Sequence, residues 1–522
     1  MDIKCKLKSI DYNLVINTAV LVFVLVAGLF NENGCLYTVQ NDMWCKLGRD
    51  LLHDFSNINK ETLSWAYDAG LANLWVNHEF LTCMLMGACS YVSNYFFAII
   101  CYIMFFMIII VEFIKNIKEN RGGNFVFYAL TVLIFAKFAN VTGFARPSAF
   151  GVLIYLVFLL VISDIFIKDI DNKRFLSLIV ILILWSCCHG GSYPIGAVTI
   201  IAFVIEDLVN TKKVERAIAV ILTYIVTTFG ILMVPVTRNS ILYNFIQHSN
   251  TEEVDEWVSI TGLQLSNKLT IFIMVAISIV TIILQYRLHR KDGRKTFLRN
   301  IALIIMLSGT FIMGCLHVRY LQYYGCVGLI LIPRYVNGYE KLDKKTITLS
   351  RIVITLSSLL FMVFLNCNIF KQQKNAYDWI EINKEHGIIN YDENFISTLL
   401  DCGEYRVINL QSGLDDILVN NDIKLFHDGR CDNMYKEPFH NMYVLYNITF
   451  EHEDERDNIK NALKSVREYN ADILNIRVRN DNKNDFNDIN WIMEQIGGNI
   501  DIIGVTPSDN MYYSAYLLKI NY

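Results

Sequence analysis

Carboxylates suited to proton transfer gather in one polar stretch near the N-terminus. Asp42, Glu61 and Glu79 all fall within residues 31–92, between two apolar runs. A hydroxyl group that attacks an electrophile must lose its proton, and a carboxylate within reach can accept it. We therefore regard these residues as candidate general bases. Solvated loop charges are the alternative interpretation, and it stays open for Glu61.

Cationic side chains stand at the ends of apolar runs later in the chain. Arg146 precedes Pro147, His189 precedes a Gly-Gly pair, and Arg319 lies in a short polar break between two apolar runs. Charged groups at a membrane segment are costly and commonly functional. Arginine can hold a phosphate by two hydrogen bonds. The two arginines are alternatively lipid anchors, and His189 is alternatively a packing residue.

These side chains together match the needs of one reaction, the transfer of a sugar from a lipid phosphate. A sugar carried on a polyprenyl phosphate presents its reactive carbon at the membrane interface. A carboxylate would accept the proton of the acceptor hydroxyl. The cations would stabilise the phosphate as it leaves with negative charge. Direct displacement of this kind inverts the anomeric centre.

The composition indicates that most of the chain lies in a membrane. Of 522 residues, 54% are hydrophobic and only 18% are charged, against about 25% charged in an ordinary globular protein. Residues 371–522 carry a net charge of −11, and the first 370 residues carry +7. This split predicts a multi-span membrane domain over residues 1–370 and a polar, acidic domain over 371–522. Nothing in the sequence is basic and aromatic enough to favour nucleic-acid binding.

The apolar runs predict about eleven transmembrane helices, since a crossing needs about 20 apolar residues. The expected spans are residues 12–30, 93–114, 125–141, 148–167, 175–190, 195–210, 217–236, 269–286, 300–316, 319–334 and 349–368.

Lys and Arg in the connecting segments set the expected orientation. With the N-terminus in the cytoplasm, cytoplasmic segments hold 23 Lys and Arg, and outer segments hold 7. Positive residues favour the cytoplasmic side. An odd number of spans then places the acidic C-terminal domain outside the cell membrane. The long loops 31–92 and 237–268 fall on the same outer side.

The C-terminal stretch alternates between strand-like and helix-like segments. About 150 residues are enough to bury a core of their own, so we expect a small α/β domain. The predicted strands are 405–410, 423–426, 473–478, 500–505 and 511–520, and the predicted helices are 453–468 and 485–496.

The order of these motifs resembles the bacterial GT-C superfamily of membrane glycosyltransferases, of the protein mannosyltransferase type. The similarity covers nearly the whole chain. It rests on short motifs in a fixed order: Asp42-Met-Trp44, Glu61-Thr-Leu-Ser64, Trp75-Val-Asn77-His78-Glu79-Phe80-Leu81, Arg146-Pro147, Trp185 with His189-Gly190, Arg319, and His427-Asp428-Gly429-Arg430.

The resemblance implies a role for each matching residue. Asp42 corresponds to the acidic residue implicated as the base, and Glu61 stands where an Asp is usual. The cations Arg146, His189 and Arg319 would bind the donor phosphate. Contacts with the sugar or acceptor are expected from Trp44, Trp75, His78 and Glu79. Asp428 and Arg430 correspond to a motif in the outer domain. Phe80 replaces a usual Trp, which leaves the sugar pocket undefined.

The implied donor is a polyprenyl-phosphate sugar, and the acceptor is a glycan, a lipid or a protein of the cell envelope. No motif demands a metal, although two or three of Asp42, Glu61 and Glu79 could hold Mg²⁺ or Mn²⁺ through oxygen ligands. A transporter or flippase for polysaccharide precursors is the alternative from another class. Such a protein should show related halves and ionisable residues near the bilayer midplane. A non-catalytic envelope assembly protein with the same fold is a third possibility.

Overall fold

The computed structural model describes most of the helical part of the chain and the larger part of the C-terminal stretch. The described residues are 16–22, 41–71, 77–93, 96–120, 146–167, 171–211, 214–247, 300–335, 406–410, 418–419, 422–426, 456–479, 489–506 and 513–522, with single positions at 129–139, 272, 276, 439, 442 and 445.

The chain divides into two compact units. The helical unit comprises residues 1–36, 95–244 and 252–369. The mixed unit comprises residues 37–94, 245–251 and 370–522.

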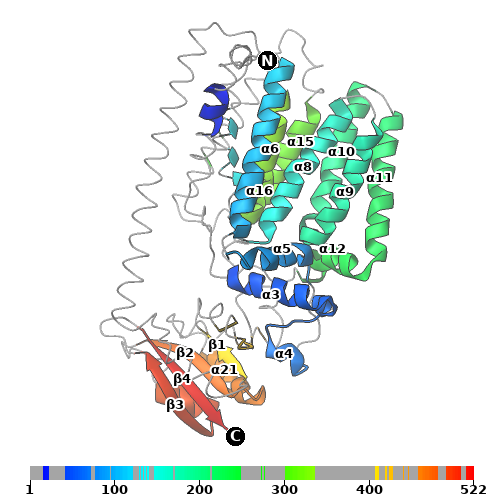
Figure 1. The fold of residues 1–522 in the computed structure, drawn as a ribbon. Helices are drawn as coiled ribbons and strands as arrows, with labels where there is room; N and C mark the ends of the chain where they lie inside the picture. The colour runs from blue at the N-terminus through cyan, green and yellow to red at the C-terminus, as the bar shows by residue number, and fades with distance from the viewer. Residues whose placement is uncertain are drawn as a thin grey trace, which may run out of the picture. The chain divides into compact units, whose positions relative to one another are not determined.

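Seven apolar helices make up most of the described helical unit, and their labels are shown in Figure 1. Their bounds are α6 (Phe96–Asn120), α8 (Ser148–Ile167), α9 (Asn172–His189), α10 (Pro194–Asn210), α11 (Val214–Met233), α15 (Ile301–Leu316) and α16 (Leu321–Tyr335). Asp171 caps the start of α9 by accepting a hydrogen bond from the backbone of Lys173. Proline occupies the first turn of α10, where its missing N–H leaves no hydrogen bond unmade.

Four of these helices, α6, α8, α9 and α11, are long and apolar enough to cross a membrane. α8 is the central helix, since 72% of its apolar stretch is buried, whereas only 22% of the apolar stretch of α11 is buried. The uncovered side of α11 carries Ile225, Val226 and Phe229, which are all more than half exposed. Such a surface fits lipid rather than water.

The described helices lie close to the spans predicted from the sequence. The predicted span 148–167 and α8 share both ends, and α6, α9, α10, α11, α15 and α16 begin within three residues of their predicted starts. Little of the predicted spans 12–30, 125–141 and 269–286, and none of 349–368, lies among the described residues. The number of eleven spans therefore stays a prediction, as does their orientation.

Two helices cross closely in the mixed unit. They are α3 (Asn41–His53) and α5 (Phe80–Ser90), with the 3₁₀ helix η1 (Phe55–Asn59) and the short helix α4 (Trp65–Asp68) between them in sequence. A Cβ atom added to Gly48 would lie 1.9 Å from the carbonyl oxygen of Cys83, and one on Gly87 would lie 2.4 Å from the carbonyl carbon of Gly48. The absence of side chains at both glycines allows the two backbones to approach this closely.

A four-stranded sheet forms the rest of the described mixed unit (Figure 1). Its strands are β1 (Val407–Asn409), β2 (Ile473–Arg479), β3 (Asn499–Thr506) and β4 (Tyr513–Asn521), in the order β1-β2-β4-β3. β1 and β2 are parallel, and the other pairs are antiparallel. Helices α21 (Arg456–Glu468) and α22 (Ile489–Ile496) contribute Leu463, Val466 and Ile492 to its core. These elements fall within the segments predicted as strands and helices, except for the last residue of β2, β3 and β4 and the first residue of β3.

The same core also contains residues from the stretch between the first two predicted spans. Trp65 and Ala66 are buried against Ile408, Phe426 and Leu474. We expected residues 31–92 to belong with the membrane domain, whereas the structure groups residues 37–94 with the C-terminal residues. The reason is apolar burial, since Trp65 cannot be buried by the short polar segments that flank it.

Candidate functional site

The mixed unit contains the acidic candidates, and Asp42 is the second residue of α3. The side chain of Asp42 lies outside the described part of the structure, as do Trp75, Asp428 and Arg430. Trp44, two residues beyond Asp42, is only 7% exposed. Its burial makes it a packing residue of α3, so any contact with a sugar is restricted to its small exposed edge.

Glu61 has a defined structural partner. Its side chain is 5% exposed, and its Oε1 accepts a hydrogen bond of 2.8 Å from the backbone N–H of Leu63. The carboxylate therefore holds the turn that leads into Ser64. Glu61 is therefore not a solvated loop charge, because its carboxylate is buried and hydrogen-bonded.

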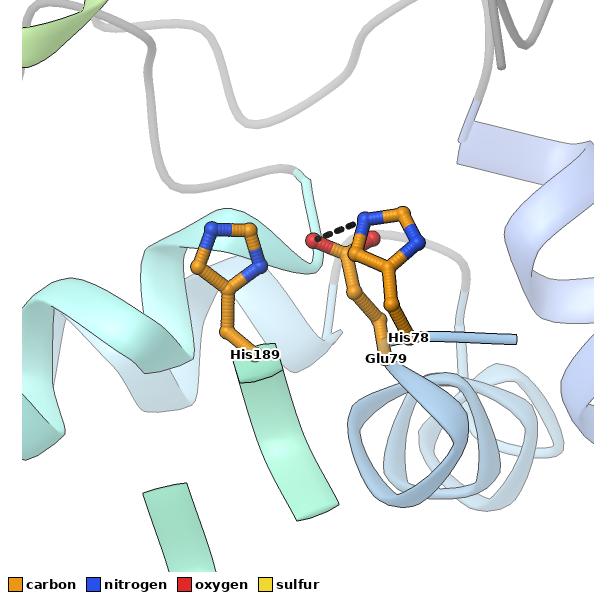
Figure 2. Close-up of side chains that lie close together, drawn as sticks. All are labelled: His78, Glu79 and His189. Atoms are coloured by element: carbon orange, nitrogen blue, oxygen red, sulfur yellow. Dashed lines mark ion pairs between the residues drawn. The ribbon is translucent and has the colours of Figure 1, made fainter. Parts of the chain in front are cut away.

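A buried turn before α5 brings a histidine and a carboxylate together. His78 Nε2 lies 3.7 Å from Glu79 Oε1, as Figure 2 shows, and both side chains are less than a tenth exposed. Asn77 Oδ1 accepts a hydrogen bond of 3.1 Å from the backbone N–H of Glu79. Sequence reasoning did not single out Asn77, although its position just before the helix start is typical of a residue that fixes a turn.

The pair of His78 and Glu79 contains the ligand atoms that a divalent cation would use. Imidazole nitrogen and carboxylate oxygen are ordinary zinc ligands, and the carboxylate also suits magnesium or manganese. Two ligands do not complete a protein site, because structural and catalytic sites use three or four. The described geometry is thus compatible with a metal and also with a plain ion pair.

The helical unit contains the cationic candidates, and His189 is the last residue of α9 (Figure 2). The imidazole lies against Gly151 in the first turn of α8, where an added Cβ would come within 2.8 Å of its Cδ2 atom. Ser192 donates a hydrogen bond of 3.0 Å to the carbonyl oxygen of His189, and Trp185 Nε1 donates one of 2.7 Å to Ser192. The backbone and the ring of His189 are both held in place.

Ring contacts connect the turn of Arg319 with the end of α9. Arg319 lies in the 3₁₀ turn η5 (Val318–Tyr320), four residues before Tyr323. The ring of Tyr323 is 5.4 Å from that of Tyr155 in α8, and Tyr155 is 5.5 Å from Trp185 in α9. The turn of Arg319 and the end of α9 therefore lie at the same end of the helical unit.

Arg146 belongs to the same end. It precedes α8 by two residues and lies five residues before Gly151, the residue that His189 contacts. The segments 146–151, 186–194 and 314–323 contain two arginines and two histidines, and their sequences include no Asp or Glu. We call these three segments the cationic end. Its charge suits an anionic ligand, and phosphate in particular.

Comparison with known proteins gives limited information. No protein-family model and no curated protein matches the sequence. Among solved structures, the chain is similar to the oligosaccharyltransferase of Archaeoglobus fulgidus, solved with a tethered acceptor peptide containing the NVT sequon. The two chains are 12% identical, the match covers 88% of this chain and 68% of the other, and the TM-score is 0.49.

A buried ionic cluster at the other end of the helices was not predicted. Arg334 of α16 forms two hydrogen bonds with Glu112 of α6, of 2.5 and 2.8 Å, and one of 2.9 Å with Asp164 of α8. Lys115 completes the cluster at 2.8 Å from Asp164. The pairing of one cation with two carboxylates on different helices cannot be read from any single apolar run.

Two further carboxylates join helices at that end. Arg216 of α11 is paired with Asp207 of α10, and Glu206 accepts hydrogen bonds from the hydroxyl of Tyr335 at 2.6 Å and the backbone N–H of Ala302 at 2.8 Å. Glu112, Asp164, Glu206 and Asp207 are thus each engaged with a cation, a hydroxyl group or a helix start.

Proposed function

We propose that the protein is an integral membrane glycosyltransferase that moves a sugar from a polyprenyl-phosphate donor to an acceptor at the outer face of the cell membrane. The reaction is a direct displacement. The acceptor oxygen bonds to the anomeric carbon, the bond from that carbon to the phosphate oxygen breaks, and the phosphate leaves with the electron pair. The configuration at the anomeric carbon is inverted.

The observation that carries this proposal is the cationic end of the helical unit. Arg146, His189 and Arg319 come from three separate segments that lie at one end of the helical unit. A cationic region beside apolar, lipid-exposed helices suits a ligand that has both a phosphate and a hydrocarbon chain.

The proton acceptor in this proposal is Asp42. Glu61 is the weaker candidate, because its carboxylate already accepts the backbone N–H of Leu63 and is nearly inaccessible. Its contact is that of a residue which positions the loop. In this proposal His78 and Glu79 contact the sugar or the acceptor.

A transporter and a non-catalytic assembly protein remain the competing functions. A transporter needs ionisable residues accessible from a central cavity. The buried residues Glu112 and Arg334, and likewise Asp207 and Arg216, are instead bound to one another. A non-catalytic protein would tolerate loss of both the base and the phosphate contacts.

The proposal is tested by single-turnover transfer from a synthetic polyprenyl-phosphate-linked hexose in nanodiscs, with an envelope extract as acceptor. Arg319→Lys and Arg146→Lys should each slow transfer about 10- to 100-fold. Lysine keeps the charge but loses the planar fork that matches phosphate. Complete removal of such a donor typically costs about 10²–10³-fold. Asp42→Asn should slow transfer by about 10²–10⁴-fold, since it removes the proton acceptor and keeps the shape.

Arg174→Lys is the matched control, because Arg174 lies at the opposite end of α9 from His189. It should transfer sugar at the wild-type rate. If Arg319→Lys and Arg146→Lys also keep that rate, the arginines are lipid anchors and the phosphate contact is wrong. If Asp42→Asn also transfers sugar at the wild-type rate, Asp42 is not the general base.

A further inference from the structure

Residues 63–65 extend the sheet of the mixed unit. The backbone N–H of Leu425 donates to the carbonyl of Leu63 at 3.0 Å, and the N–H of Trp65 donates to the carbonyl of Leu425 at 2.9 Å. Leu425 in turn pairs with Val407 of β1, and both pairings are parallel. A short piece of the first outer loop is therefore the outermost strand-like segment on the β1 side, separated from its partner by about 360 residues.

Side chains strengthen this pairing. Ser64 Oγ donates a buried hydrogen bond of 2.6 Å to the carbonyl of Phe426, and Trp65 Nε1 donates one of 3.0 Å to the carbonyl of Val407. The Trp65 ring packs edge-on against Phe426 with centroids 5.0 Å apart, and the guanidinium of Arg406 lies over it at 5.6 Å. An aromatic contact with a satisfied indole N–H is an effective anchor.

The same segment is tied to the residues expected to perform chemistry. Glu61 Oε1 accepts the N–H of Leu63, and Thr62 Oγ1 donates a hydrogen bond of 2.9 Å to Asp50 of α3. α3 is the helix that contains Asp42. Residues 63–65 are thus linked directly to Glu61, and they are linked to Asp42 through Thr62, Asp50 and helix α3.

A second contact joins α3 to the C-terminal residues. Lys46 Nζ donates a hydrogen bond of 2.6 Å to Asp422, three residues before Leu425. Partial burial lowers the pKa of Lys46, but the hydrogen bond to Asp422 and the charges of Asp50 and Asp422 outweigh it, so the pKa lies above its usual value. Lys46 therefore stays charged, and this contact persists, at neutral pH.

We infer that the C-terminal residues are a positioning scaffold for the first outer loop, and that Ser64 and Trp65 are the positioning residues through which it acts. The inference rests on the proposed function, in which that loop contains the proton acceptor. The C-terminal residues of the mixed unit then contribute to turnover without direct contact with the donor. A loop of more than 50 residues between two membrane spans would otherwise sample many conformations, and fixing it lowers the entropic cost of reaching the reactive geometry.

The test compares full-length Trp65→Ala, Trp65→Phe and the control Tyr91→Ala. Tyr91 belongs to the same loop and is 73% exposed. Two quantities are measured in nanodiscs: amide hydrogen exchange of residues 41–71 and 406–426, and kcat and KM for a polyprenyl-phosphate-linked hexose. For Trp65→Ala we expect faster exchange in both segments and a 10- to 100-fold lower kcat, since small misplacements of reactive groups have effects of about that size. KM for the donor should stay nearly unchanged.

Trp65→Phe should restore most of kcat, because it keeps a ring against Phe426 and loses only the indole hydrogen bond. Tyr91→Ala should match wild type in both measurements. The inference is overturned if exchange increases without a change in kcat. It is also overturned if kcat falls without a change in exchange, since Trp65 would then act directly on a substrate.

Failure of the proposed function gives a different result. If the wild-type protein transfers no sugar, the glycosyltransferase proposal is wrong and the catalytic part of the inference is wrong with it. Amide hydrogen exchange alone still tests whether residues 61–71 pack on residues 406–426. Joint acceleration of 61–71 and 406–426 in Trp65→Ala supports it, and independent behaviour of the two segments contradicts it.

Discussion

His189 shows how one side chain depends on a position that has no side chain. Its ring fits against α8 because residue 151 is a glycine, and its carbonyl is held by Ser192. A histidine at a helix end is in a favourable position for a positive charge, because the helix dipole is negative there. Together these features hold the imidazole of His189 in place at the end of the helical unit where the proposed reaction develops negative charge.

Gly151→Ala should therefore displace the imidazole with little effect on the fold. The added methyl group would lie 2.8 Å from Cδ2 of His189, well inside contact distance. We expect transfer from a polyprenyl-phosphate sugar to slow about 10- to 100-fold, with a melting temperature within a few degrees of wild type. Gly309→Ala in α15 is the control, since nothing lies within 4 Å of its added Cβ. Equal turnover of the two variants would remove His189 from the site.

At the scale of elements, the crossing of α3 and α5 illustrates how two glycines decide a contact. Both helices lie in the expected loop 31–92, and no local pattern predicts how closely they approach each other. Gly48 and Gly87 face each other, and a methyl group on Gly48 would overlap the backbone of Cys83. Backbone atoms cannot move aside as a flexible side chain can, so overpacking here is expensive.

Gly48→Ala is expected to separate the two helices and to lower the stability of the mixed unit by about 1–3 kcal/mol or more. Faster proteolysis within residues 31–92 and a lower melting temperature in detergent would report this change. Gly230→Ala in α11 is the comparison, because its added Cβ meets open space, and alanine is the better helix former by about 1 kcal/mol. A Gly48→Ala protein as stable as Gly230→Ala would show that the helices can separate at no cost.

At the scale of the whole molecule, buried ion pairs hold together the end of the helical unit opposite the cationic end. Arg334 bridges α6, α8 and α16, and Arg216 ties α11 to α10. Both arginines are less than a tenth exposed. Breaking a buried pair by removing one partner leaves an uncompensated charge and typically costs about 3–5 kcal/mol.

Arg334→Gln should accordingly lower the melting temperature of the detergent-solubilised protein strongly. The double variant Arg334→Gln/Glu112→Gln should recover part of the loss, because the isolated carboxylate is then neutral. Arg238→Gln, at an exposed position of α12 (Pro235–Gln247), serves as the control and should melt as wild type does. Melting of Arg334→Gln at the control temperature would mean that the cluster is hydrated and does not hold the helices.

Local patterns predicted the position of most described elements, but not of α3, α4, α5 and α12, which fall largely within the expected loops 31–92 and 237–268. A run of about 20 apolar residues can only form a helix in lipid, because every backbone polar group must be satisfied within the segment. This constraint predicted 148–167 as a span, and α8 has those ends. Alternating apolar residues predicted 473–478 as a strand of the C-terminal sheet for a similarly local reason. The candidate cations Arg146, His189 and Arg319 could also be named from the sequence, since a charge at the end of an apolar run is visible there.

Tertiary structure decided which of these elements share a core and which charges meet. Nothing within ten residues of Trp65 indicates that it packs on Phe426, or that Arg334 binds Glu112 across 222 positions. Periodicity reports only which face of an element is buried. The partner of that face is selected by complementary shape, hydrogen bonding and charge among segments far apart in the chain. For this reason the sequence determined most of the helices and strands and the candidate residues, whereas the packing of Trp65 on residues of the C-terminal sheet became evident only in the folded chain.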